Sequence, residues 1–425
     1  MKDNSGNNYI YAGDKTKLYN INGVTVTDYS QVGDYTDNSE AWGFIKWGEQ
    51  VIASKLGDTP QVLTLGGTTF ADLSGSPPQG RTISTIRDFV IIGNTWDSTD
   101  GNVTNRIRWS GFNDETGWTV GTNQSDYQDL EGRGGAVQRI AGGEFGIIFQ
   151  EKSIWRQTYV GTPTVFQFDE IEPGRGTPAA GSVAQYGATI FYLGQDGFYV
   201  LENGTTSAPI GANKVDKYFW NDVNESYLSS ISATISPDDG VVMWAYPSTS
   251  SNGEPDKIII YSYKTGKWSH AELNTQLLFQ GATSAYTLED LDAFGTIDTL
   301  TSSLDSAVWQ GGSFKTAAFN TDNKLSFFTG NIMAATLKTG EIGSEAEKTT
   351  VQSVRPVIDG VCTLALETRN SRIDTPVEGL AESIDSSGKA NFRTNKRYHR
   401  VKMVTSGDFT HAQGVEVVSI ARGNR

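Results

Sequence analysis

The side chains best suited to acid–base catalysis or metal binding at neutral pH are three histidines, His270, His399 and His411. No two of them stand at the spacing of metal ligands. The sequence also lacks HExxH, GxSxG, a phosphate-binding P-loop and a dinucleotide-binding GxGxxG after a strand. A single histidine in a β-rich domain is usually structural or exposed. We therefore predict that the chain is not an enzyme and has no catalytic residue, no metal site and no cofactor.

Carboxylates could serve glycoside hydrolysis or calcium binding, and three short segments invite that interpretation. SPDDGVVMW (236–244) resembles the Asp-box turn S-x-D-x-G-x-x-W of sialidase propellers, but it has one residue too many before Trp244 and no second copy. DSTDGN (97–102) and GQDGF (194–198) lack the alternating ligands and terminal Glu of an EF-hand loop. Asp-Gly is typical of hairpin turns, so we interpret these segments as turns.

Two further features could carry reactivity or charge. Cys362 is the one cysteine, which excludes an intramolecular disulfide and a Cys-based zinc site. Its flanking sequence VCTLAL indicates a buried strand, so we expect a small core residue. The run NKRYHRVK (395–402), with Arg393, is the only sizeable cationic cluster. Strand alternation favours a solvated strand face, and a contact with an acidic neighbouring subunit is the functional alternative.

The elements that carry these residues are mostly short strands. The 425 residues include 47 glycines and 11% aromatics, and a helical pattern is found only around 213–223. Strand–turn–strand units recur at the spacing of about 40–50 residues that propeller blades require. Trp109, Trp155, Tyr199 and Tyr261 follow the apolar strand in four of them. The units are residues 48–65, 87–111, 143–161, 187–211 and 239–273.

The pattern predicts an all-β chain with two domains. Residues 1–330 are expected to form a β-propeller of about six blades, with five and seven blades as the alternatives. Residues 7–30 and 307–330 are each expected to supply half of a blade that closes it. Residues 331–425 contain five or six alternating strands, enough for a small β-sandwich, with further blades as the alternative.

Charge separates the same two parts. The formal net charge is −15; residues 1–330 hold 21 Lys and Arg against 38 Asp and Glu, and residues 331–425 hold 13 against 11. An acidic chain is poorly suited to holding nucleic acid, although DNA could pass through an acidic channel without binding. The sequence has no long apolar stretch, so we expect no membrane insertion and a protein that is soluble in the cytoplasm until it assembles.

Several stretches resemble phage and prophage tail proteins. They include IYAGDKTKLYNING, RIRWSGFNDETGWTVGTNQSDYQDL, QDGFYVLENGTTSAPIGANKVDKYFW and TDNKLSFFTG. The longest and most specific stretch is 133–176, which contains GGAVQRIAGGEFGIIFQEKSIWRQTYVG. The resemblance covers most of residues 9–330 and is weaker near the end of the chain. By architecture this family is similar to the tail hub or nozzle proteins of short-tailed bacteriophages.

The resemblance implies a non-enzymatic virion structural protein located in the virion tail and assembled in the host bacterial cytoplasm. Such a subunit would form a cyclic homo-oligomer, with a hexamer expected, below the portal and the adaptor (head–tail connector) proteins. Genomic DNA would pass its channel during ejection without specific binding. The alternative is a receptor- or carbohydrate-binding tail propeller. An intracellular peptide-binding propeller is less consistent with the sequence, because WD and GH signatures are missing.

Overall fold

A computed structural model describes residues 1–22, 25–282, 295–300, 303, 314–329, 332–407 and 409–422. The chain divides into two compact units, Met1–Phe328 (unit 1) and Thr329–Arg425 (unit 2), close to the boundary predicted at residue 330. Among the described residues the α-helix is α1 (Asp216–Asp222), which lies inside the segment where the sequence predicts a helix. Three 3-10 turns are found in the described ranges: η1 (Ala180–Ser182), η2 (Glu225–Ser230) and η4 (Ile297–Thr299).

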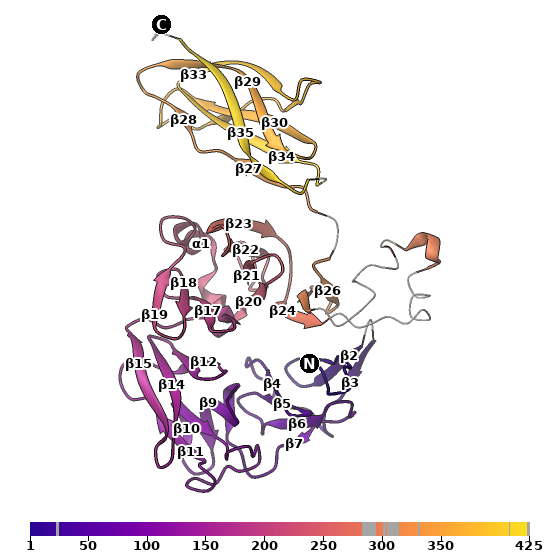
Figure 1. Ribbon diagram of the computed structural model, residues 1–425, viewed down its shortest axis with the longest axis vertical. Coiled ribbons are helices and arrows are strands. Elements are labelled where there is room, and N and C mark those ends of the chain that lie inside the picture. The colour runs from indigo at the N-terminus through magenta and orange to yellow at the C-terminus, as the bar shows by residue number, and fades with distance from the viewer. Residues whose placement is uncertain are drawn as a thin grey trace. The chain divides into compact units, whose positions relative to one another are not determined.

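Five four-stranded antiparallel sheets follow one another round unit 1 in chain order (Figure 1). In each, the strands pair in the order in which the chain makes them, which is the blade pattern of a β-propeller. The prediction of an all-β propeller is therefore confirmed. The strands are β4 (Gly43–Trp47), β5 (Gln50–Ser54), β6 (Gln61–Thr64), β7 (Ala71–Asp72); β8 (Gln79–Ile86), β9 (Phe89–Asp97), β10 (Gly101–Trp109), β11 (Asp126–Asp129); β12 (Val137–Ala141), β13 (Gly146–Gln150), β14 (Ser153–Gly161), β15 (Val165–Pro173); β16 (Ala184–Tyr186), β17 (Thr189–Leu193), β18 (Phe198–Glu202), β19 (Thr206–Pro209); and β20 (Ser232–Ser236), β21 (Val241–Tyr246), β22 (Lys257–Ser262), β23 (Lys267–Glu272).

A three-stranded sheet stands at each end of unit 1, and here the expectation of one shared blade is wrong for the described residues. The strands of residues 7–30 pair only with one another, whereas within residues 307–330 the strand Phe314–Phe319 pairs with the strands Leu277–Ala282 and Leu325–Phe327. Residues 307–313 and 330 lie outside the described part of the chain. The described part of unit 1 thus contains seven consecutive sheets. The end sheets are β1 (Ile10–Gly13), β2 (Leu18–Asn22), β3 (Thr25–Asp28), and β24 (Leu277–Ala282), β25 (Phe314–Phe319), β26 (Leu325–Phe327).

The first strands of neighbouring blades pack against each other in four places: β4 against β8, β8 against β12, β16 against β20, and β20 against the strand Leu277–Ala282 that follows it. Between β8 and β12 the backbone N–H of Gly143 donates to the carbonyl of Thr85 at 3.0 Å, and the N–H of Arg87 donates to the carbonyl of Gly143 at 2.9 Å. Between β20 and β24 the N–H of Leu278 donates to the hydroxyl of Ser232 at 2.9 Å. These bonds satisfy backbone groups that would otherwise be left unpaired at the junctions between blades.

Apolar side chains fill the spaces between blades. Phe89 and Trp109 of the β8–β11 sheet pack edge-on against Phe166 of the next sheet, with ring centroids 5.0 and 5.1 Å away. Trp244 is fully buried, and its indole N–H donates to the carbonyl of Ser182 at 2.9 Å. Each large aromatic buried in this way contributes on the order of 2–3 kcal/mol from the area it removes from water.

Unit 2 is a β-sandwich-like domain, as the sequence predicts. A six-stranded sheet and a three-stranded sheet, in the order β33-β29-β35, enclose a core that includes Val354, Leu364, Val401 and Met403. The strands are β27 (Thr336–Lys338), β28 (Ile342–Gly343), β30 (Cys362–Arg369), β31 (Val377–Glu378), β32 (Glu382–Ser383) and β34 (Tyr398–Thr405) in the first sheet, and β29 (Lys348–Ile358), β33 (Ala390–Lys396) and β35 (Ala412–Arg422) in the second.

Candidate functional site

The three histidines do not come together. The ring of His270 lies 5.5 Å from that of Tyr218, and the buried Nε2 atom of His399 is 2.8 Å from the carbonyl oxygen of Thr349. The backbone N–H of His411 donates to the carboxylate of Asp359, in the turn between β29 and β30. Within the described part of the chain, no group of three or more His, Cys, Asp and Glu side chains could hold a metal ion.

Cys362 lies in the core of unit 2. It is 3% exposed and belongs to the cluster that contains Leu364 and Met403. Burial raises the pKa of its thiol, which disfavours the reactive thiolate. The interpretation as a small core residue is confirmed.

The carboxylates of the three Asp-containing segments stabilise turns or neighbouring side chains. Asp97 accepts from the backbone N–H groups of Thr99 and Asp100 at 2.8 Å, in the hairpin between β9 and β10. The hydroxyl of Ser236 donates to the Asp239 carboxylate at 2.6 Å in the turn between β20 and β21. The phenol of Tyr199 donates to the carboxylate of Asp196. These contacts confirm the interpretation as hairpin turns.

Electrostatics around Asp97 favour its charged form. Burial opposes ionisation, but the hydrogen bonds from the N–H groups of Asp100 and Thr99, together with the nearby Arg108, outweigh it and hold the pKa below its ordinary value. The Arg108 guanidinium lies 3.2 Å from this carboxylate. The charge of Asp97 is therefore committed to holding the hairpin.

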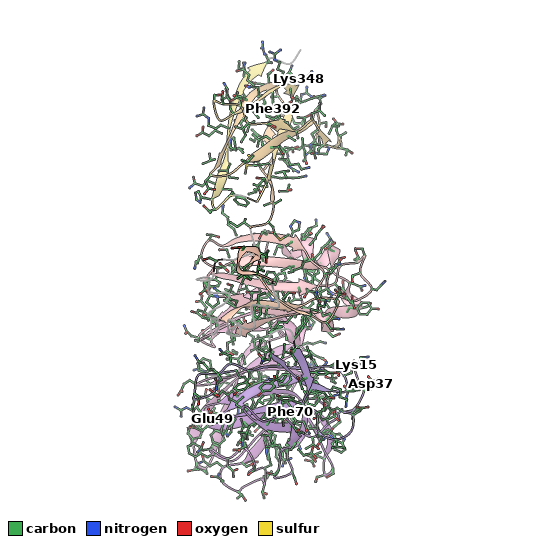
Figure 2. The ribbon with its side chains drawn as sticks, turned by 90° about the vertical axis from the view of Figure 1, so that its right-hand side faces the viewer. Lys15, Asp37, Glu49, Phe70, Lys348 and Phe392 are labelled. Carbon is green, nitrogen blue, oxygen red and sulfur yellow. The ribbon has the colours of Figure 1, made fainter. Side chains whose placement is uncertain are left out.

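Two of the four cations in the basic run 395–402 form ion pairs within unit 2. Lys402 pairs with Glu378 at 2.7 Å, and Arg400 lies 3.5 Å from Glu367, which also pairs with Lys338. Partnered charges of this kind match the interpretation as a strand face. In unit 1, exposed pairs such as Lys15–Asp37, labelled in Figure 2, balance only a minority of the carboxylates.

Three cations on the three-stranded sheet of unit 2 are among those that lack an ion-pair partner in the described part of the chain. Lys348 and Arg422 are direct cross-strand partners in β29 and β35, a placement that disfavours both charges unless an anion is near. Arg393 of β33 also lacks an ion pair. Val418 and Ile420 of β35 are 54% and 42% exposed. This set, which we call the β35 surface, combines unpaired positive charge with exposed apolar area.

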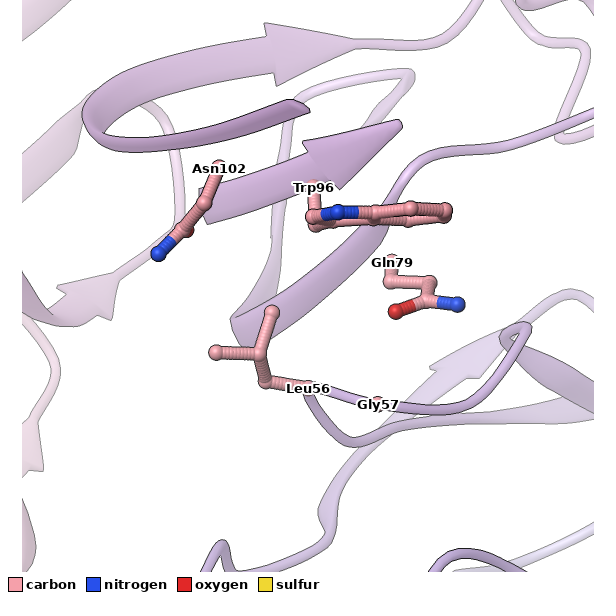
Figure 3. A pocket seen from close by; sticks show the side chains of 5 residues that line it. All are labelled: Leu56, Gly57, Gln79, Trp96 and Asn102. Carbon is pink, nitrogen blue, oxygen red and sulfur yellow. The ribbon is translucent and has the colours of Figure 1, made fainter. Parts of the chain in front are cut away.

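An open pocket of about 410 Å³ lies in unit 1 between the β5–β6 turn and the β8–β11 sheet. Leu56 and Gly57 form one wall. Gln79, Trp96 and Asn102 form the other, and Figure 3 shows the indole of Trp96 above the Gln79 side chain, with Asn102 to the left of both. Gln79 and Asn102 are the direct cross-strand partners of Trp96 in β8 and β10. The sequence analysis interpreted the DSTDGN segment, which ends at Asn102, as a turn, and it proposed a binding role for none of these five residues.

The comparisons with known proteins do not indicate a function for this chain. No family model matches the chain, and no curated protein is similar to it. Among solved structures it is similar to the extracellular domain of BT4673 from B. thetaiotaomicron, at 10% identity and a TM-score of 0.46 over 93% of this chain and 45% of that one. It is also similar to BamB from Moraxella catarrhalis, at 10% identity and a TM-score of 0.37 over 77% and 82%.

The chain thus spans less than half the length of the first of these proteins, and both TM-scores are below 0.5, so neither likeness carries an argument about function. The class of protein is defined by the sheets themselves: a β-propeller followed by a β-sandwich-like domain. In the described residues no helix is long and apolar enough to cross a membrane.

Proposed function

We propose that the chain is a non-enzymatic virion structural protein, a hub or nozzle subunit that forms a ring round the DNA exit channel of a bacteriophage tail. The resemblance of residues 9–330 to phage tail proteins motivates this proposal. The observation that carries it is the charge difference between the units. Unit 1 holds 21 cationic against 38 anionic side chains, and unit 2 holds 13 against 11.

A ring requires two complementary surfaces on each subunit. The β35 surface, with Lys348 and Arg422 side by side, supplies a cationic surface next to exposed apolar side chains. The acidic unit 1 of a second copy supplies the complementary charge. A lumen lined mainly by Asp and Glu would let DNA pass, because cationic walls would bind phosphates with an affinity that rises steeply with each contact.

The test is electron microscopy of intact virions together with the purified protein. We expect several copies in a closed ring below the portal and adaptor, six being the expected number. Replacing both Lys348 and Arg422 by Glu should reduce incorporation into the ring, whereas the charge-matched double change Lys217→Glu with Lys324→Glu, at two exposed lysines of unit 1, should not. A single copy at a fibre tip, or a lumen lined by Lys and Arg, contradicts the proposal.

A further inference from the structure

The pocket beside Trp96 has an ordered arrangement of binding groups. Gln79, Trp96 and Asn102 are register partners on three adjacent antiparallel strands, so their side chains leave the sheet on the same face. Directly opposed residues have Cβ atoms about 5 Å apart, so the row of three spans about 10 Å. An aromatic plane with an amide on either side is thereby held by the backbone pairing itself.

The polar groups of this row are unused. The indole of Trp96 is 41% exposed, and neither its N–H nor the side-chain amides of Gln79 and Asn102 have a hydrogen-bond partner among the described residues. Each amide offers two donors and an acceptor, so the three side chains together present donors and acceptors round an apolar plane. Such a combination is typical of pockets that orient a small polar ligand.

Both walls of the pocket are fixed before any ligand arrives. On one side the Asn38 side-chain amide donates to the carbonyl of Leu56 at 2.8 Å, and the Thr36 hydroxyl donates to that of Gly57 at 3.1 Å. Gly57 has a φ of +107°, and a Cβ there would lie 2.6 Å from the Asn38 amide nitrogen. On the other side Asp97 holds the hairpin that begins directly after Trp96. Fixed walls lower the ordering cost of binding.

From this geometry we infer that the pocket binds a neutral saccharide through stacking of one sugar ring on Trp96. A pyranose offers an apolar face to the indole, and its hydroxyls both donate and accept, as the flanking amides require. None of the five lining residues is charged, and the unit that contains them is strongly acidic. Nucleotides and acidic sugars are therefore disfavoured by repulsion. The inference concerns unit 1 alone and does not rest on ring assembly.

The test is calorimetric titration of the full chain with four neutral pentasaccharides: maltopentaose, cellopentaose, chitopentaose and mannopentaose. An open site with one aromatic side chain should bind in the millimolar range, so ligand is taken to about 10 mM. We expect at least one of the four to bind. Trp96→Ala should weaken that binding about tenfold or more, Trp96→Phe should weaken it less, and the double change Gln79→Ala with Asn102→Ala should weaken it severalfold.

Tyr186→Ala is the matched control, because Tyr186 is a 53% exposed aromatic of unit 1 outside the pocket. We expect its affinity and melting temperature to equal those of the original chain. The inference is overturned if none of the four sugars binds, if Trp96→Ala binds as well as the original chain, or if sialyllactose binds more tightly than lactose. Melting curves of the Trp96→Phe and double variants show whether any loss of affinity accompanies an intact fold.

Discussion

Lys55 is the buried charge that ties the residues before β4 to the first complete blade. Its side chain is fully buried, and its ammonium group donates to the carbonyl oxygens of Lys15 at 2.6 Å and Thr36 at 2.7 Å. The Asp58 carboxylate lies 3.0 Å away, and the ammonium also lies over the ring of Trp42 at 5.0 Å. Three donors thus meet three oxygen acceptors, which is the condition under which a buried ammonium is tolerated.

Lys55→Met keeps the length of the side chain and removes its charge, so these acceptors lose their donor. Breaking one side of a buried pair costs about 3–5 kcal/mol. Asp58 is 13% exposed and keeps its bonds from Thr36, so we expect about 3 kcal/mol. At about 2.1 cal/mol/K per residue, unit 1 (Met1–Phe328) has an unfolding entropy of about 0.7 kcal/mol/K. The melting temperature of unit 1 should therefore fall by about 4 °C.

Differential scanning calorimetry measures this shift, with Lys46→Met as the control. Lys46 lies in the same blade but is 38% exposed and faces Glu49 at 3.6 Å, so its loss should cost less than about 0.5 kcal/mol. If Lys55→Met melts within about 1 °C of the original chain, the reasoning that this contact fastens the N-terminal segment is refuted.

Three further changes test other contacts. Deleting residues 1–30 removes Leu18 from the core it shares with the first complete blade and should give insoluble protein; a truncated chain with unchanged solubility and melting would contradict this. Gly75→Ala should cost more than about 2 kcal/mol in urea unfolding, because φ is +85° and the new Cβ would lie 1.7 Å from a backbone carbonyl oxygen; an unchanged urea midpoint would show that the loop adapts. In unit 2 the hydrogen bond from Lys338 lowers the pKa of Glu367, so its charge stabilises the fold above the ordinary value of 4.5 and this stabilisation is lost as pH falls through the lower folded value. Glu367→Gln should thus cost about 1–2 kcal/mol at pH 7, and its deficit relative to the original chain should narrow in melts below pH 4.5; a deficit independent of pH would contradict the assignment.

The local strand–turn–strand pattern of the sequence predicts the central strands of each blade. It does not predict how strands that are far apart in the chain pair with one another. The units 87–111 and 143–161 contain β9–β10 and β13–β14, because an apolar strand, a turn and a returning strand are all visible within one short segment. The first strand of each blade was missed. β16, for example, has three residues, and its place depends on packing against neighbouring blades. The prediction of a blade shared by 7–30 and 307–330 was wrong for the described residues for the same reason, since no local signal chooses between distant partners.

The candidate pocket was only half visible in the sequence. The turn that starts at Asp97 and ends at Gly101 places Trp96 opposite Asn102, and an exposed aromatic at the mouth of a polar hairpin was a usable signal. Gln79 and Leu56 could not be found in this way, because one comes from the preceding strand and the other from another blade. The chemistry of the pocket therefore depends on tertiary packing rather than on a sequence motif.

The pairing of charged residues also could not be predicted from the sequence. The run 395–402 is the densest cationic stretch of the sequence, yet Arg400 and Lys402 form ion pairs with carboxylates on other strands of their own sheet. Lys348 and Arg422 attract no notice in the sequence because they are far apart in the chain, but strand pairing brings them together without an anion. A binding partner is attracted by charge that neighbouring residues do not compensate, and the number of charged residues in a stretch of sequence does not measure this. The β35 surface, and not the basic run, is therefore where substitutions should first be made to look for a subunit contact.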